Sequence, residues 1–258
     1  MNARSLTAGL VYYTGKFFAN LVTMHKYEAV GTDAIPKREP FVIMASHDSS
    51  MNIIEDGNLT TRRLSFLSKS ENYNNPVFSL LQRLGGQIRF DRSGANMDEV
   101  YSGLEHAVID NIGIVIYPEG TRNTAPIIGK AGRRVIDIVG HVVELSSRHH
   151  ARIYFVALGR TVDGSGYTTV TCEQKAYAEN GQIVIPEGNA KLEYEMQKPE
   201  GKGLEFFVNG HIMPTLARLS HKTYNPSVSA IMIGMLSKRG TRHLPKKPDP
   251  GKSPTRNN

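Results

Sequence analysis

The amino-acid sequence predicts an α/β fold with a largely parallel central sheet flanked by helices. Short apolar runs of the kind that form buried strands alternate along the chain with longer segments whose apolar residues recur at helical spacing. Several of these runs are bounded by Gly or Pro, which favour turns. Strands that alternate with helices favour crossover connections and therefore parallel pairing.

Five apolar runs are predicted as the strands of this sheet. They are short and rich in aliphatic or aromatic residues, and they span residues 41–45, 64–68, 87–90, 113–117 and 153–158. The first run begins after Pro40, and Pro118 ends the fourth. Beyond Gly159 the pattern changes, and shorter strands are predicted over residues 167–172, 182–185 and 191–196.

Helices are predicted in the intervals between the strands. Two apolar faces with helical spacing comprise Met97, Val100, Tyr101, Leu104 and Val108, and Val135, Ile136, Val139, Val142 and Val143. A shorter helix is predicted from Pro76 to Leu84, because Pro is favourable in the first turn. A last helix is predicted over residues 203–219.

The chain is predicted to comprise an N-terminal amphipathic helical segment (1–26), one main domain (27–236) and a disordered basic tail (237–258). Between Leu6 and Met24 apolar residues recur at helical spacing, but Lys16 and Asn20 interrupt them, so the segment is not expected to span a membrane. Two interpretations stay open. The helix packs on the protein, or its aromatic face lies in a membrane interface.

Net charge excludes one class of function. The chain carries a formal charge of +7, but seven of its 31 Lys and Arg residues follow residue 237, where Asp249 is the only acid. The remainder is nearly neutral, which argues against a nucleic-acid-binding face. The tail is either solvated or docked on anionic lipid headgroups. The single cysteine, Cys172, permits no intramolecular disulfide and is expected to be a structural strand residue.

Three polar segments follow predicted strands, which is where open α/β sheets bind ligands. Residues 45–52 include His47, a residue type suited to general-base catalysis. Residues 85–93 include Arg89 and Arg92, and guanidinium groups suit phosphate. Residues 117–123 combine a glycine that permits a sharp turn with threonine and arginine donors.

Together these segments resemble the glycerolipid acyltransferase family. The resemblance covers residues 27–161 and is strongest for Tyr-Pro-Glu-Gly-Thr-Arg at 117–122 and Ile-Arg-Phe-Asp-Arg at 88–92. It implies that the main domain is an acyltransferase domain, with a glycerol-3-phosphate acyltransferase-like fold, on the cytoplasmic face of a membrane. It also implies transfer of a fatty acyl chain from acyl-CoA or acyl carrier protein to 1-acylglycerol-3-phosphate, giving phosphatidate. The expected partners are a phospholipid surface, the thioester co-substrate and a lysophospholipid acceptor, with no cofactor and no metal.

The resemblance also implies roles for particular residues. The first motif of the family is a histidine followed, after four residues, by an aspartate; here His47 is followed by Asn52. The resemblance makes these two the catalytic pair. It implies a phosphate-binding pocket formed by Arg92, Glu119, Gly120, Thr121 and Arg122. Because Glu119 is an anion, it is expected to anchor Arg122 or the loop rather than to contact phosphate.

Asn52 leaves three interpretations open. Its amide oxygen can accept a hydrogen bond from the His47 ring, but the amide carries no negative charge and its NH₂ can select the wrong tautomer. In the second interpretation Asp48, Glu55 or Asp56 serves as the carboxylate. In the third, the protein is a non-catalytic relative that binds phospholipids. On the sequence alone, Asn52→Asp is expected to raise the rate of an active enzyme.

Overall fold

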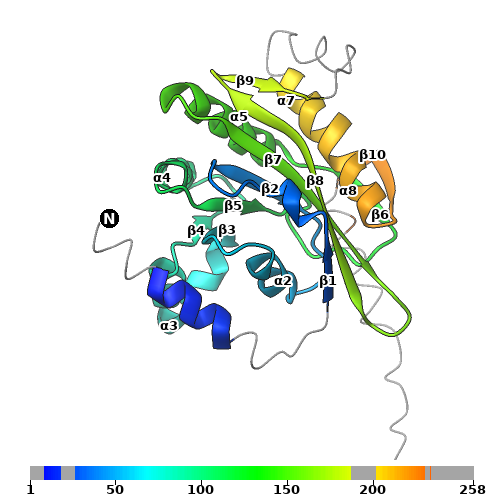
Figure 1. Ribbon diagram of the computed structural model, residues 1–258, viewed down its shortest axis with the longest axis horizontal. Helices are drawn as coiled ribbons and strands as arrows, with labels where there is room; N and C mark the ends of the chain where they lie inside the picture. The colour runs from blue at the N-terminus through cyan, green and yellow to red at the C-terminus, as the bar shows by residue number, and fades with distance from the viewer. Residues whose placement is uncertain (1–8, 19–26, 187–201, 230–232, 234–258) are drawn as a thin grey trace, which may run out of the picture.

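The computed structural model describes residues 9–18, 27–186, 202–229 and 233, and it is built around one mixed sheet (Figure 1). The strands are β1 (Tyr27–Val30), β2 (Phe41–Ala45), β3 (Leu64–Lys69), β4 (Ile88–Phe90), β5 (Gly113–Ile116), β6 (Ile127–Lys130), β7 (Ile153–Val162), β8 (Thr168–Glu179), β9 (Gln182–Val184) and β10 (Thr223–Ser229). The central sheet has eight strands in the order β1-β8-β7-β2-β5-β3-β4, with β9 paired to β8. β10 and β6 form a separate two-stranded sheet.

The core of the sheet is parallel, as predicted. β2 pairs in parallel with β5 and β7, and β3 pairs in parallel with β5 and β4. Antiparallel pairing enters with β8, which runs against β7 and β9 and parallel to β1. The ends of β2, β4 and β5 that carry the three polar segments therefore lie at one edge of the sheet.

Helices cover both faces of the sheet (Figure 1). They are α2 (Asn52–Asn58), α3 (Pro76–Leu84), α4 (Met97–Ile109), α5 (Arg133–Arg148), α7 (Lys202–Phe206) and α8 (Met213–Leu219), with the π-helical segment η3 (Phe207–Ile212) joining the last two. Short 3₁₀ turns occur at η1 (Thr32–Ala34) and η2 (Ser70–Tyr73). The helices predicted after Pro76, around residues 97–108 and 135–143, and over residues 203–219 are all confirmed.

Alternation along the strands divides the core into two layers. Val42 and Met44 of β2 point to the larger layer, which they form with buried residues of α4, α5 and α8. Phe41 and Ile43 point to the opposite layer, against which Tyr12 of the N-terminal helix (9–18) packs. Both layers are buried because a sheet covered on both faces exposes neither set of side chains.

The structure contains elements that the sequence pattern does not predict. β6 has only four residues, two of them exposed, and β10 contains Pro226 and few apolar residues. α2 escapes prediction because the side that it buries is polar, comprising Asn52, Glu55 and Asp56. The strand predicted over residues 191–196 and the tail over 237–258 lie outside the described residues, and the proposed domain boundaries stay predictions.

The N-terminal helix (9–18) combines features of both interpretations of this segment. Tyr13 Oη donates to the Thr61 carbonyl oxygen at 2.8 Å, and Lys16 Nζ donates to the Thr60 carbonyl oxygen at 3.2 Å. Leu10, Phe17 and Phe18 remain 70%, 63% and 57% exposed. Within the described ranges, no helix has the length and apolarity needed to span a bilayer. The helix therefore packs through one side and presents apolar side chains on the other.

Candidate active site

The three polar segments meet around a cavity of about 490 Å³ at one edge of the sheet. His47 follows β2, Arg92 follows β4, and Gly120 and Arg122 lie in the loop after β5; all four line this cavity. They converge because these strands are neighbours or near neighbours in a parallel arrangement. The site predicted from widely separated segments is therefore one place in the fold.

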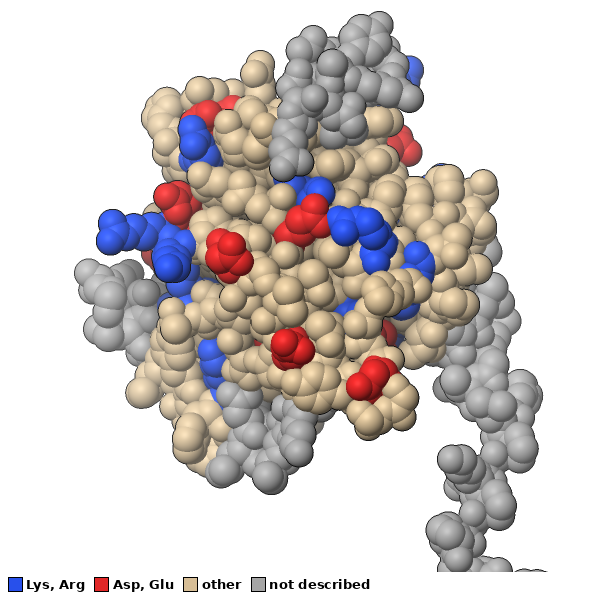
Figure 2. Space-filling model, turned by 45° about the vertical axis from the view of Figure 1, so that its right-hand side comes forward, with Lys and Arg blue, Asp and Glu red and all other residues tan. Residues whose placement is uncertain are grey.

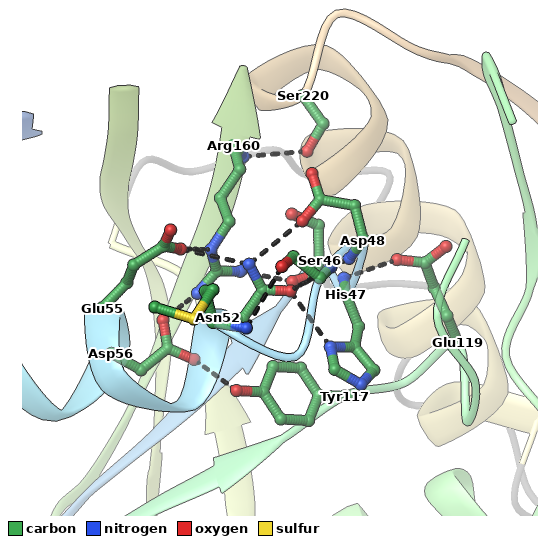
Figure 3. Close-up of polar contacts among 12 residues, drawn as sticks. Ser46, His47, Asp48, Asn52, Glu55, Asp56, Tyr117, Glu119, Arg160 and Ser220 are labelled. Atoms are coloured by element: carbon green, nitrogen blue, oxygen red, sulfur yellow. Dashed lines mark hydrogen bonds and ion pairs between the residues drawn. The ribbon is translucent and has the colours of Figure 1, made fainter. Parts of the chain in front are cut away.

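Two contacts of its ring and one of its backbone hold His47 in place (Figure 3). Its Nδ1 lies 3.1 Å from Asn52 Oδ1, on the first turn of α2. The imidazole stacks on the Tyr117 ring, with centroids 4.2 Å apart and planes inclined by 21°. The His47 backbone N–H donates to Glu119 Oε1 at 3.0 Å. The ring is thus oriented with Nδ1 on Asn52, which leaves Nε2 as the nitrogen available to a substrate.

Burial lowers the pKa of His47 to about 4. The hydrogen bond to Asn52 opposes this shift, whereas the positive charges of Arg160, Lys69 and Arg122 add to it. The partner of the ring is an amide rather than a carboxylate, so it brings no charge that would compensate an imidazolium. At neutral pH the imidazole is uncharged and able to accept a proton.

A buried ionic cluster lies directly behind Asn52. Glu55 and Asp56 occupy the same inward side of α2 as Asn52, because residues three and four apart share a helix face. Arg160 of β7 is fully buried; its Nε donates to Glu55 Oε2 at 2.8 Å, and its Nη2 donates to Asp56 Oδ1. Tyr117 Oη donates to Asp56 Oδ2 at 2.7 Å. The cluster joins α2 to β7 and to the residue on which His47 stacks.

The main chain is tied into the same cluster. Arg160 Nη1 donates to the Ser46 carbonyl oxygen, and the Arg160 backbone N–H donates to Ser220 Oγ at 3.1 Å. The first bond links the guanidinium to the end of the strand that carries His47, and the second links β7 to the residue that follows α8. Arg160 was not among the residues predicted for the site. Arg160 lies in β7 two residues beyond the apolar run 153–158, and that pattern contains no specific signal for a site residue.

Glu119 supports the loop rather than lining the cavity. Its buried carboxylate accepts from the His47 backbone N–H and from Asn123 Nδ2 at 2.6 Å. Burial raises the pKa of Glu119, while the charge of Lys222 opposes the shift. Lys222 Nζ donates to the Asn123 carbonyl oxygen at 2.6 Å, so the chain before β10 fastens this loop. These contacts place Glu119 as a support of the loop, while its part in substrate binding stays a prediction.

The cationic residues at the cavity come from three segments. Arg92 Nη2 donates to the Gly120 carbonyl oxygen, which joins the second polar segment to the third. Arg122 is exposed, and Lys69 at the end of β3 also lines the cavity. Thr121 is buried and does not line it. Arg89 lies instead over the ring of Tyr73. Lys69 was missed as a site residue because a single lysine at a strand end is not specific.

Most of the remaining cavity wall is apolar. Its lining side chains include Tyr12, Ile53, Ile54, Phe66, Leu67 and Ile116. Ile53 is 49% exposed although it lies beside the buried side of α2. A single cavity therefore offers a neutral imidazole, several cations and an apolar wall, which suits a substrate with a charged head and a hydrocarbon chain.

Comparisons with known proteins agree with this geometry. The sequence profile of the family described as Acyltransferase matches residues 26–162. No protein of curated function matches the sequence. Among solved structures, the crystal structure of the 1-acyl-sn-glycerophosphate (LPA) acyltransferase PlsC from Thermotoga maritima superposes with a TM-score of 0.51 and 18% identity, over 84% of this chain and 81% of that one. The shared fold confirms the predicted architecture, and the profile covers more than half of the chain. The chain therefore belongs to the acyltransferase family.

Proposed function

We propose that this acyltransferase moves a fatty acyl chain from an acyl thioester, acyl-CoA or acyl carrier protein, to a hydroxyl of 1-acylglycerol-3-phosphate, giving phosphatidate. One observation carries the proposal: a single cavity combines His47, Arg92 and Arg122 with an apolar wall. Those features match the three parts of the reaction, namely a hydroxyl to deprotonate, a phosphate to bind and a hydrocarbon chain to shelter. The fold shared with the Thermotoga maritima enzyme supports the same reaction class.

In this proposal His47 is the general base. Nε2 accepts the proton of the acceptor hydroxyl while the hydroxyl oxygen attacks the thioester carbonyl carbon. Collapse of the tetrahedral intermediate breaks the carbon–sulfur bond, and the imidazolium returns its proton to the leaving thiolate. The pKa of His47, lowered by burial, keeps the ring neutral before the reaction begins.

The acceptor phosphate is proposed to lie against Arg92 and Arg122. Guanidinium groups bind phosphate through paired N–H donors, and Gly120 lets the loop approach closely through its positive φ of 64°. Glu119 and Thr121 contribute by shaping the loop from within. No cofactor or metal enters this scheme.

The direct test is an acyl-transfer assay with purified protein, acyl-CoA or acyl carrier protein, and 1-acylglycerol-3-phosphate. Formation of phosphatidate supports the proposal. Binding of the lysophospholipid without acyl transfer from either donor would favour the alternative, a non-catalytic phospholipid-binding relative. A phosphate-free acceptor such as monoacylglycerol shows whether the phosphate is recognised at all.

Arg92→Gln is expected to raise KM for 1-acylglycerol-3-phosphate by about 10- to 100-fold, because one charge-assisted phosphate contact is lost. The value for monoacylglycerol should stay unchanged. Steady-state kinetics with both acceptors measures the difference. Arg133→Gln is the matched control, since Arg133 is an exposed arginine that pairs with Asp137 on α5. Equal effects on both acceptors would remove Arg92 from the phosphate site.

A membrane phospholipid surface is the proposed source of the acceptor, reached from the cytoplasmic side. The N-terminal helix and α3 both border the cavity, through Lys16 and Gln82. Both also expose apolar side chains, including Phe17 on the helix and Leu80 and Leu81 on α3. In contrast, basic and acidic side chains of the described residues are interspersed on the face that Figure 2 shows. The exposed apolar side chains beside the cavity support docking through them.

The double substitution Leu80→Ser/Leu81→Ser is expected to weaken binding to phospholipid vesicles by at least about 10-fold, because two apolar side chains no longer enter the interface. Co-sedimentation with vesicles measures the binding. The single change Val162→Ser removes an exposed apolar side chain at the end of β7 and should leave binding unchanged. An equal loss in both variants would contradict docking through α3.

A further inference from the structure

The orientation of the Asn52 amide follows from its neighbours. Asn52 Oδ1 faces the backbone N–H groups of Asp48, at 3.0 Å, and Ser49, at 2.9 Å. Backbone N–H groups only donate, so the atom that they face is the amide oxygen. On the other side, Asn52 Nδ2 lies 3.0 Å from Asp48 Oδ1 and 3.1 Å from Glu55 Oε2, two carboxylate acceptors. The four contacts agree on one orientation.

This orientation determines the tautomer of His47. Since Asn52 Oδ1 is an acceptor, the His47 Nδ1 that lies 3.1 Å away must carry the proton. The lone pair then lies on Nε2. The hazard that an asparagine NH₂ selects the other tautomer is removed, because both amide hydrogens are directed to Asp48 and Glu55.

The same surroundings disfavour an aspartate at position 52. An aspartate would place a second carboxylate oxygen about where Nδ2 now lies, next to the carboxylates of Asp48 and Glu55. Arg160 already donates to Glu55, to Asp56 and to the Ser46 carbonyl oxygen. Like charges at this separation in a buried site repel strongly and force one of the groups to take up a proton.

We propose that Asp48, Glu55 and Arg160 are positioning residues for acyl transfer, which hold Asn52 so that its amide oxygen orients His47. Arg160 positions Glu55, Glu55 and Asp48 position the amide, and the amide oxygen positions the imidazole. The carboxylates of Asp48 and Glu55 thus act on the ring through Asn52 instead of contacting it directly. The expectation from the sequence that Asn52→Asp raises the rate is therefore reversed. The expected change in rate rests on the proposed function, whereas the tautomer of His47 does not depend on it.

A charge swap tests by kinetics the positioning relay that runs from Arg160 through Glu55 and Asn52 to His47. Asn52→Asp alone is expected to lower kcat by at least about 10-fold with little change in KM for the acceptor. The double variant Asn52→Asp/Glu55→Gln should recover most of that loss. The swap restores the number of carboxylates found in the wild-type cluster, and the new carboxylate no longer faces one at position 55. Asn180→Asp adds the same charge in the exposed turn before β9 and serves as the control, with kcat unchanged. Unchanged or higher kcat in Asn52→Asp, or no recovery in the swap, would overturn the relay.

A second measurement needs no catalysis. ¹⁵N NMR of the labelled protein at neutral pH should show a protonated Nδ1 and an unprotonated Nε2 for His47, with its signals assigned by their loss in His47→Gln. If that pattern were found in a protein without acyl transfer, the orientation of His47 by the Asn52 amide would stand and the proposed function would be rejected. A neutral ring with its proton on Nε2 would contradict the orientation of His47 by the Asn52 amide, whatever the activity.

Discussion

Replacing Arg160 by methionine is expected to lower the free energy of unfolding by about 3–5 kcal/mol, because it leaves two buried carboxylates without their counter-charge. Glu55 and Asp56 are 2% and 0% exposed, and both are bound to this guanidinium. Methionine has a similar shape but offers neither charge nor donors. Urea denaturation followed by circular dichroism measures the change.

Two further variants make this result specific. Arg152→Met removes an arginine of an exposed pair with Glu179 just before the same strand, and it should change the unfolding transition only slightly. Adding Glu55→Gln and Asp56→Asn to Arg160→Met should recover much of the lost stability, since buried polar groups without charge are tolerated better than unpaired ions. If Arg160→Met destabilised no more than Arg152→Met, the cluster would not be the buried ionic centre described above.

His47→Gln is expected to lower kcat by about 10²- to 10⁴-fold, the range typical of losing a general base. Glutamine keeps a polar side chain of similar length but does not take up a proton near neutral pH. His106→Gln, an exposed position on α4, is the control and should leave kcat unchanged. Urea midpoints of both variants separate loss of catalysis from loss of fold. Acyl transfer that survives His47→Gln would require another base.

The pH profile of the wild-type enzyme also tests the assignment of His47 as the general base. A base must be neutral to act, and the pKa of His47, lowered by burial and by Arg160, Lys69 and Arg122, is about 4. The ring is therefore neutral at every pH above that value, and kcat/KM should fall on the acid side only as pH approaches about 4. A fall near 6 would point instead to Asp56, whose pKa burial raises to about 6.

The sequence was sufficient for the elements that are continuous apolar runs or whose apolar side chains repeat at helical spacing. β2, β5 and β7 were found because buried parallel strands are continuous apolar runs, and α4 and α5 because one face of each is apolar. α2 was not found because its buried side is polar, and a polar stretch after a strand is expected to be a loop. This helix buries its polar side because that side forms part of the candidate site.

The candidate site was predicted as far as its residues follow strands. His47, Arg92, Gly120 and Arg122 were predicted and meet at one cavity, because the parallel order of strands brings their ends together. Arg160 was missed because its partners lie on α2, more than 100 positions earlier in the chain. For Asn52→Asp the sequence alone predicts a higher rate, whereas the proposed positioning of the Asn52 amide predicts a lower one. What an amide or a carboxylate does at position 52 depends on the residues that surround it, and the motif spacing does not contain them.

The position of β8 between β1 and β7 has a consequence for the nascent chain. Tyr27 of β1 pairs with Thr168 of β8, about 140 residues later in the chain. At typical rates of translation, β8 is therefore synthesised on the order of ten seconds after β1. The strands β2, β5, β3 and β4 are complete earlier and can already pair with one another. Until β7 emerges, β2 exposes a free strand edge, and Glu55 and Asp56 lack Arg160. The arrival of β7 at the ribosome exit therefore covers the free edge of β2 and supplies the counter-charge for Glu55 and Asp56 in one step.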